Sequence, residues 1–298
     1  NYTRINNEMY FIDSLKQNDW YVLKTPATVK KPIFYYKKQF VNLKSTANQA
    51  DYLLITHPKF LDKANEYATF VQSSYNINTK VINVFDIYDE FNYGMFAPQP
   101  IKEFLQYAYH NWQTPNIKNV CIVGRSNYDY YGYKTKYQAA PVEICYVPSY
   151  GSPVSDTWYV IWDTTGANIP QINIGRLPVR SNEEFEHYFE KHQNYVNNPY
   201  TRWNKTFLFF SGGNFTDPNQ INTLKGINDN LIEQYVNPSP IGGLATHFYK
   251  TVNPLTNFGP YSSDFIQRQI DYGSVFISYL GHSGTQTWDN SITDPIQL

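Results

Sequence analysis

The chain has 298 residues, 42% of them hydrophobic and 16% charged, and this composition predicts a folded globular protein of one large or two ordinary domains. Its formal net charge of −1, without a long run of Lys and Arg, argues against a nucleic-acid partner. No apolar run approaches the roughly 18 residues of a membrane span, so none is predicted.

Residues 1–48 alternate loosely between apolar and polar positions, as in WYVLKT and PIFYYKKQF. This pattern predicts a short antiparallel β segment or a linker. From Asp51 the pattern changes to apolar strands separated by amphipathic helices, which is typical of parallel sheets built from βαβ units. We therefore expect a first α/β subdomain over residues 49–198.

The elements expected in this subdomain follow one another at short intervals. Strands are predicted at 51–57, 79–85, 119–124, 143–147 and 157–163, followed by the apolar stretch 170–179, and helices at 58–75, 101–112 and 181–196. A polar loop follows the strand that ends at Gly124. Ligand sites in open α/β sheets lie at such strand ends.

A polar, turn-rich break at 197–205 separates this region from a second one. In the second region, strands are predicted at 206–211, 245–250 and 274–282, and helices at 219–235 and 262–273. Only ten residues follow Trp288. We therefore expect residues 199–298 to be the opening half of a second α/β subdomain, truncated in this chain.

The stretch GHSGT, residues 281–285, offers two alternatives for catalysis. Ser283 resembles the nucleophile of a G-x-S-x-G strand-to-helix turn, but Thr285 stands where the second glycine belongs and no His follows. The other alternative takes His282, on the loop after a buried strand, as a general base, with the small residues Ser283 and Gly284 letting backbone N–H groups approach an oxyanion. A His that only bonds locally at a strand end is the structural alternative to both.

Cysteine and metal chemistry find little support in the residues themselves. Cys121 and Cys145 lie in apolar stretches, so we expect buried, unreactive thiols. No pair shows the H-x-x-x-H spacing or the Cys/His ligand spacing of a zinc site, and no metal ligand is assigned. Asp129, Asp156 and Asp163 could supply oxygen ligands to Ca²⁺ as a structural ion.

Two motifs are the most specific in the chain: the IGRLPVRS block, and a strand ending in Gly-His with a Trp six residues later. Together with DYLLITHPKFLDKANEYATF, NVCIVGRSNYDYYG and SVFISYLGHSGTQTWDN, in this order, they resemble the gingipain-like family of cysteine peptidases. The resemblance extends from about Asp51 to Asn290. It implies a caspase-like α/β fold whose parallel-sheet subdomains are flanked by helices.

The resemblance also implies roles for single residues. His282 would be the catalytic base, and its partner would be a Cys at the end of the next core strand, beyond residue 298. The backbone N–H after His282 would help to bind the oxyanion. The chain departs from the family pattern at Ser283, where relatives carry glycine, and at Ser211, where some relatives carry a carboxylate that orients the His. The residues expected to line the site are Gly281, Ser211, Gly212, Trp288 and Asp289.

The resemblance thus implies a cysteine endopeptidase that acts on proteins or peptides, or a member of the family's sortase branch. No cofactor is required, and this chain alone would be incomplete and inactive. The family is typical of Bacteroidetes and is exported by the type IX secretion route, so a secreted or cell-surface location is expected, with secretion components as further partners. The main alternative is a non-catalytic surface or secretion-apparatus scaffold, and a serine hydrolase using Ser283 is more distant.

Overall fold

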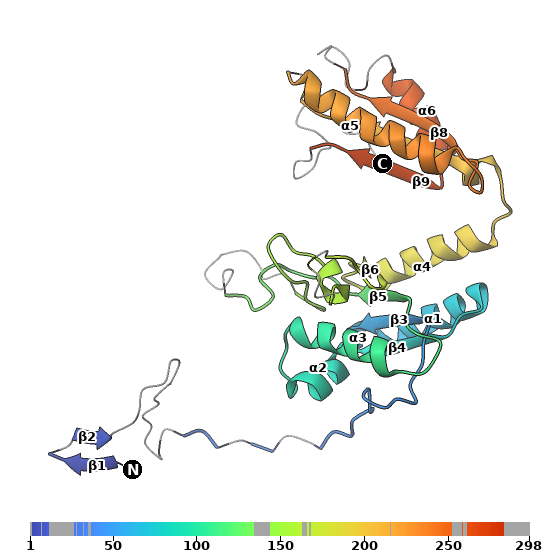
Figure 1. Ribbon diagram of the computed structural model, residues 1–298. Helices are drawn as coiled ribbons and strands as arrows, with labels where there is room; N and C mark the ends of the chain where they lie inside the picture. Colours follow the sequence, from blue (N-terminus) through green and yellow to red (C-terminus); the bar gives the residue numbers. More distant parts are fainter. Residues whose placement is uncertain are drawn as a thin grey trace. The chain divides into compact units, whose positions relative to one another are not determined.

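The chain forms two compact units in its computed structural model, Asn1–His187 and Tyr188–Leu298 (Figure 1). The described residues are 2–6, 8–11, 27, 29–31, 33–34, 37–133, 144–162, 166, 168–214, 216–251, 258 and 261–282. Near the amino end, β1 (Tyr2–Ile5) and β2 (Glu8–Phe11) pair as antiparallel strands. This hairpin is the short β segment expected before the α/β units.

The first unit contains four parallel strands in the order β4-β3-β5-β6. These strands are β3 (Tyr52–Thr56), β4 (Thr79–Asn83), β5 (Asn119–Val123) and β6 (Asn173–Leu177). The helices are η2 (Pro58–Phe60), α1 (Leu61–Tyr75), α2 (Val84–Asn92), α3 (Gln99–Asn111) and α4 (Asn182–Asn197), within which the boundary between the units falls. The predicted parallel sheet with flanking helices is confirmed.

The central strands of this sheet are buried on both faces because both faces are covered. Leu53 and Ile55 of β3, and Val120 and Ile122 of β5, lie in one core with buried side chains of α2 and α3. Leu54 is equally buried, and the period of two along a strand directs its side chain to the other face.

Two predicted strands of the first unit are wrong. Residues 157–163 begin with a short 3₁₀ helix, η4 (Thr157–Val160), and the described part of 143–147 forms no strand. Tyr159 and Val160 are nevertheless fully buried. A short buried run of apolar residues has no periodicity that separates a strand from a helical turn.

Helix α2 was not predicted, because the strand before it was expected to continue to Phe85. Strand β4 ends at Asn83, whose side-chain oxygen accepts a hydrogen bond from the backbone N–H of Phe85 at 3.0 Å. This N-cap satisfies a donor of the first helical turn and begins the helix.

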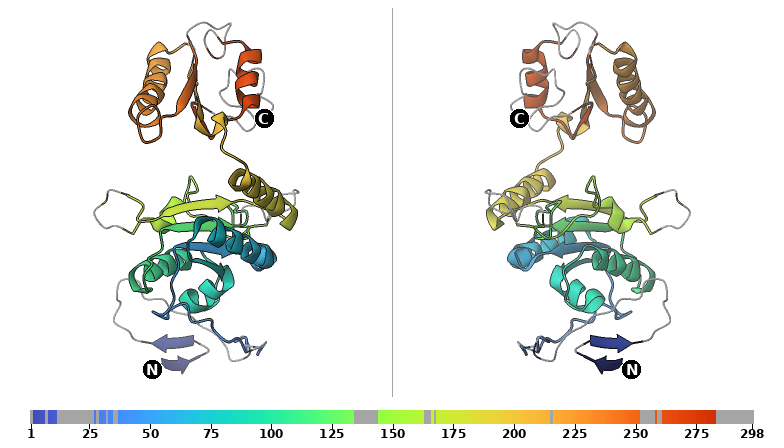
Figure 2. Two further views of the ribbon diagram at one scale, coloured as in Figure 1. Left: turned by 90° about the vertical axis from the view of Figure 1, so that its right-hand side faces the viewer. Right: turned by 90° about the vertical axis from the view of Figure 1, so that its left-hand side faces the viewer.

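The second unit contains three parallel strands in the order β8-β7-β9. Its elements in chain order are η5 (Arg202–Lys205), β7 (Thr206–Ser211), α5 (Pro218–Leu231), a π-helical turn (Ile232–Val236), β8 (Leu244–Tyr249), α6 (Ser263–Tyr272) and β9 (Phe276–Leu280). Figure 2 shows α5 and α6 on opposite faces of this sheet.

The side chains of β7 alternate between these two helices. Leu208 and Phe210 pack in one cluster with Ile266 of α6. The Ser211 hydroxyl instead contacts a backbone carbonyl of α5. Strand β7 therefore presents apolar side chains to α6 and, at its carboxyl end, a polar one to α5. Among the described residues, no helix has the length and apolar character needed to cross a membrane.

Candidate active site

His282 lies two residues after the end of β9, at the carboxyl edge of the second sheet, and is exposed. The Tyr279 hydroxyl donates a hydrogen bond to the backbone carbonyl of His282 at 2.5 Å. The backbone N–H of Gly212 donates to the carbonyl of Leu280 at 2.9 Å, which joins the ends of β7 and β9. The backbone that carries the imidazole is therefore fixed while the residue itself faces solvent.

Gly281 leaves room at this strand end for the side chain of Tyr279 and the backbone of Gly212. A methyl group at position 281 would lie 2.5 Å from the hydroxyl oxygen of Tyr279 and 3.2 Å from the Cα of Gly212. Real Cβ atoms essentially never lie as close as 2.5 Å to another heavy atom, so the Tyr279 hydroxyl would have to move. Glycine therefore lets the chain pass between Tyr279 and Gly212 on its way to His282.

Ser211 ends β7 and is only 1% exposed. Its hydroxyl oxygen lies 2.8 Å from Nε2 of His247 and accepts a hydrogen bond from Nδ2 of Asn228 at 2.8 Å. The carbonyl oxygen of Leu224 lies 3.2 Å away. Ser211 is thus enclosed by polar groups of α5 and β8.

His247 continues this network toward the surface. Its Nδ1 lies 2.8 Å from Oδ1 of Asp229, whose Oδ2 pairs with Nζ of Lys225 at 2.5 Å. Burial lowers the pKa of His247, although the hydrogen bond to Asp229 opposes this shift. The imidazole is therefore neutral at pH 7. The proton on Nδ1 faces the carboxylate, so Nε2 can accept the hydroxyl proton of Ser211.

The carboxylate of Asp229 stays ionised in this arrangement. Burial by itself would raise the pKa of Asp229, but the hydrogen bonds from Lys225 and His247 outweigh it and lower the pKa. An ionised carboxylate is the partner that a neutral imidazole needs in order to hold its proton on Nδ1.

Ser211, His247 and Asp229 are bonded in the order of a serine hydrolase triad, but Ser211 does not face a substrate surface. Its hydroxyl is buried against α5. The three residues instead cross-link β7, β8 and α5. Sequence reasoning missed His247, Asp229 and Asn228, because their partners lie 17 to 36 residues away and no spacing motif connects them.

Four of the residues predicted for the site meet at one edge of the second sheet, namely Gly281, His282, Ser211 and Gly212. Ser283, Gly284, Trp288 and Asp289 lie outside the described residues. The roles predicted for all of these residues stay predictions.

Both cysteines are free thiols in the first unit. Cys121, in β5, is buried, and burial raises the pKa of its thiol to about 11. Cys145 is half-buried, and burial raises its thiol pKa as well. Because the thiolate is the nucleophilic form, neither environment activates a cysteine.

The carboxylates considered for Ca²⁺ have other partners. Asp156 accepts two hydrogen bonds from Arg176, both at 2.7 Å, and one from the Ser149 hydroxyl. Asp129 accepts a hydrogen bond from the backbone N–H of Tyr133, and Asp163 lies outside the described residues. In the part of the chain that the structure describes, no group of three or more His, Cys, Asp or Glu could hold a metal ion.

A pocket of about 460 Å³ lies at the carboxyl edge of the first sheet, near the loop predicted to carry ligands. Its lining residues are Arg125, Ser126, Ser149, Val154, Arg176, Pro178 and Arg180. The Arg176 guanidinium also donates to the carbonyls of Gly124, Val147 and Pro148. Arg180 pairs with Glu184. Arg176 therefore serves mainly to hold β6 against the chain segments beside it.

The model of peptidase family C25 matches residues 45–297, whereas no curated protein matches the chain. The structure is similar to the complex of Porphyromonas gingivalis RgpB pro- and mature domains, with 17% identity and a TM-score of 0.53 over 80% of this chain and 49% of that chain. This likeness confirms the expected caspase-like α/β fold.

A second similar structure is dimeric latent PorU from Porphyromonas gingivalis, with 16% identity and a TM-score of 0.42. The match covers 50% of this chain and 16% of that chain. The chain therefore spans about half of the matched RgpB structure and a smaller part of PorU.

Proposed function

Because the chain belongs to peptidase family C25, we propose that it forms part of a cysteine endopeptidase with His282 as the general base. One observation carries this assignment: His282 is exposed at the carboxyl end of β9, while the backbone there is held by the Tyr279 hydroxyl and by the hydrogen bond from Gly212 to Leu280. A general base needs a fixed position and access to the substrate, and this strand end supplies both.

We assign the nucleophile to a cysteine beyond residue 298, at a strand end within reach of His282. Cys121 and Cys145 do not suit this role, since burial raises the pKa of both thiols. An imidazole beside a thiol lowers the thiol pKa and makes thiolate available near neutral pH.

In this scheme His282 takes the thiol proton, and the thiolate attacks the carbonyl carbon of a peptide bond. The C–N bond breaks, the leaving amine receives the proton from His282, and a thioester remains on the cysteine. His282 then removes a proton from water, or from an acceptor amine in a sortase, and the attack of that group releases the acyl part. No cofactor is needed, and any Ca²⁺ would be structural.

We further propose that the parent protein is secreted or held at the cell surface and acts on proteins or peptides, with type IX secretion components as partners. The family assignment supports protein substrates. The similar RgpB structure comes from Porphyromonas gingivalis, which agrees with the bacterial group expected from the resemblance.

A non-catalytic scaffold is the second candidate, and one observation favours it. In the described part of the chain, no carboxylate bonds to the imidazole of His282. The Ser211 hydroxyl contacts His247 instead of His282. A base without an orienting partner is less effective.

The decisive experiment replaces His282 by Ala in the full-length parent protein and measures cleavage of a fluorogenic protein substrate. We expect kcat/KM to fall at least about 100-fold, because proton transfer by a positioned base contributes that much. The matched control is His187→Ala, an exposed His of α4, which should retain activity. Retained activity in His282→Ala would disprove the base assignment. A parent that neither cleaves substrate nor reacts with a thiol-directed probe would identify the scaffold.

A further inference from the structure

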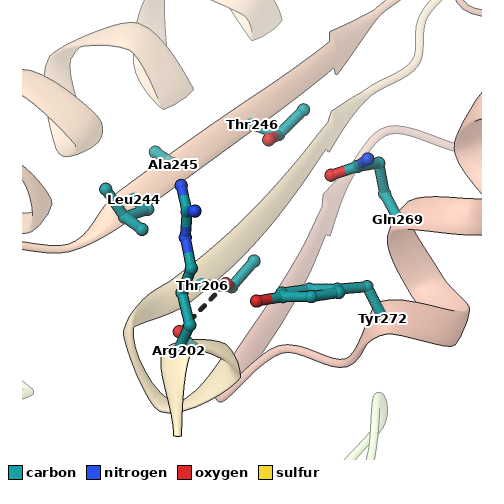
Figure 3. Close-up of a pocket in the computed structure, with 7 residues that line it drawn as sticks. All are labelled: Arg202, Thr206, Leu244, Ala245, Thr246, Gln269 and Tyr272. Carbon is teal, nitrogen blue, oxygen red and sulfur yellow. Dashed lines mark hydrogen bonds between the residues drawn. The ribbon is translucent and has the colours of Figure 1, made fainter.

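The second unit has a pocket of about 310 Å³ at the amino edge of its sheet, the edge opposite to His282. The lining residues are Arg202, Thr206, Leu244, Ala245, Thr246, Gln269 and Tyr272. They come from η5, from the first residues of β7 and β8, and from α6. Figure 3 shows these side chains around one hollow, with Arg202 on one side and Gln269 and Tyr272 on the other.

The polar groups of this pocket are largely unused by the fold. Within the described ranges, the side chains of Arg202, Thr246, Gln269 and Tyr272 make no hydrogen bond or ion pair. Only the Thr206 hydroxyl is engaged, donating to the Arg202 carbonyl at 3.3 Å. Arg176 in the first unit is the contrast, because its guanidinium is fully used by Asp156 and by backbone carbonyls.

We propose that this pocket binds a carboxylate that is carried on a small apolar group. The Arg202 guanidinium offers a planar fork of donors that matches the two oxygens of a carboxylate. The Thr246 hydroxyl, the Gln269 amide and the Tyr272 hydroxyl are neutral donors on the other sides. Leu244 and Ala245 supply an apolar wall for the rest of the ligand.

The charge and the size of the pocket favour a small carboxylate over a phosphate. One guanidinium balances one negative charge, which suits a carboxylate better than a phosphate dianion. A volume of about 310 Å³ is at the small end for ligand pockets and holds one side chain or a small acid. The carboxylate can come from a free organic acid or from a peptide. This site is independent of the function proposed for His282.

The test is an NMR titration of the 298-residue chain with propionate, inorganic phosphate, and acetyl-Ala-Leu with either a free or an amidated carboxyl end. We expect propionate or the free peptide to give saturable shifts at the backbone amides of Arg202, Thr246 and Gln269. Arg202→Gln should weaken that binding at least about tenfold, because a charge-assisted hydrogen-bonded pair is lost. Arg268→Gln, an exposed Arg of α6 outside the pocket, is the matched control and should bind like the original chain.

Tighter binding of the free peptide than of propionate, with no binding of the amide, would identify a peptide carboxylate. Propionate binding that the peptide does not match would identify a free acid, and both outcomes support the site. Equal affinity in Arg202→Gln, tighter binding of phosphate, or no saturable shift would overturn it. If Arg202→Gln alters the fold, Tyr272→Phe tests the site instead. This variant removes one hydroxyl only, and it should also weaken the binding of the carboxylate.

Discussion

At the scale of single residues, Gly281 connects local packing to the proposed chemistry. Its role rests on space, because a methyl group there would overlap the Tyr279 hydroxyl, which in turn binds the His282 carbonyl. Gly226, within α5, has nothing within 4 Å of the place where a Cβ would stand. The two glycines therefore differ in what a methyl group would meet.

We expect Gly281→Ala to lower the free energy of unfolding of the second unit by about 1–3 kcal/mol, because overpacking forces Tyr279 to move. Gly226→Ala is the matched control and should raise the free energy of unfolding by about 0.5–1 kcal/mol, since alanine is favoured within a helix. Urea denaturation of both variants measures the difference. Equal effects in the two variants would show that the contact of Gly281 with Tyr279 is absent in solution.

At the scale of secondary structure elements, a polar network holds β7, α5 and β8 together at the edge that carries His282. Ser211, His247 and Asp229 each come from a different element. His247 lies in this network as a neutral ring, since burial lowers its pKa below the ordinary value of 6.5. The folded chain therefore binds a proton at this residue only at lower pH than the unfolded chain does.

This lowered pKa predicts a direction for stability against pH. As the pH falls below about 6.5, the unfolded chain gains a proton at His247 that the folded chain does not, so stability is lost with acid. We expect His247→Gln to reduce this loss between pH 7 and pH 5 by up to about 1.4 kcal/mol per pH unit. Urea denaturation across this range measures it, with pH 8 as the reference for each protein. Burial also lowers the pKa values of His57 and His192. These two residues are still present in His247→Gln, so the variant should keep part of the stability loss at acid pH. An unchanged slope would contradict a neutral His247 in the fold.

The sequence predicted most of these elements because the strands are apolar runs and the helices are amphipathic. It failed where a short apolar run was buried without periodicity, as at Thr157–Val160. It located His282 because a strand end with Gly-His is a local pattern. It could not locate the partners of Ser211, since Asn228 and His247 reach that hydroxyl only after α5 and β8 pack on β7.

Each of the two units contains its own parallel sheet and its own buried core. In the first unit, Arg176 is a central tie: its guanidinium side chain is 10% exposed, and it binds Asp156 and three backbone carbonyls. Loss of this side chain would leave the Asp156 carboxylate without its cation. The loss should therefore lower the free energy of unfolding of the first unit.

We expect Arg176→Met to destabilise the first unit by about 3–5 kcal/mol, the cost of breaking a buried ion pair by removing one partner. In scanning calorimetry, Arg176→Met should lower one unfolding transition and Gly281→Ala the other. Lys37→Met, which changes an exposed Lys of the same unit, is the control and should leave both transitions in place. A single transition that both variants shift together would show that the two units unfold as one.

Strand β7 carries the Arg202 pocket near its first residue and adjoins the His282 loop at its last. Its six residues, Thr206–Ser211, span about 17 Å, which is longer than a small carboxylate can reach. A ligand in the pocket therefore leaves room for a peptide at His282. Suppose that a carboxylate bound in this pocket slows peptide cleavage at His282. Because it does not occupy the place of the peptide, it would act as a non-competitive inhibitor, which lowers kcat without changing KM.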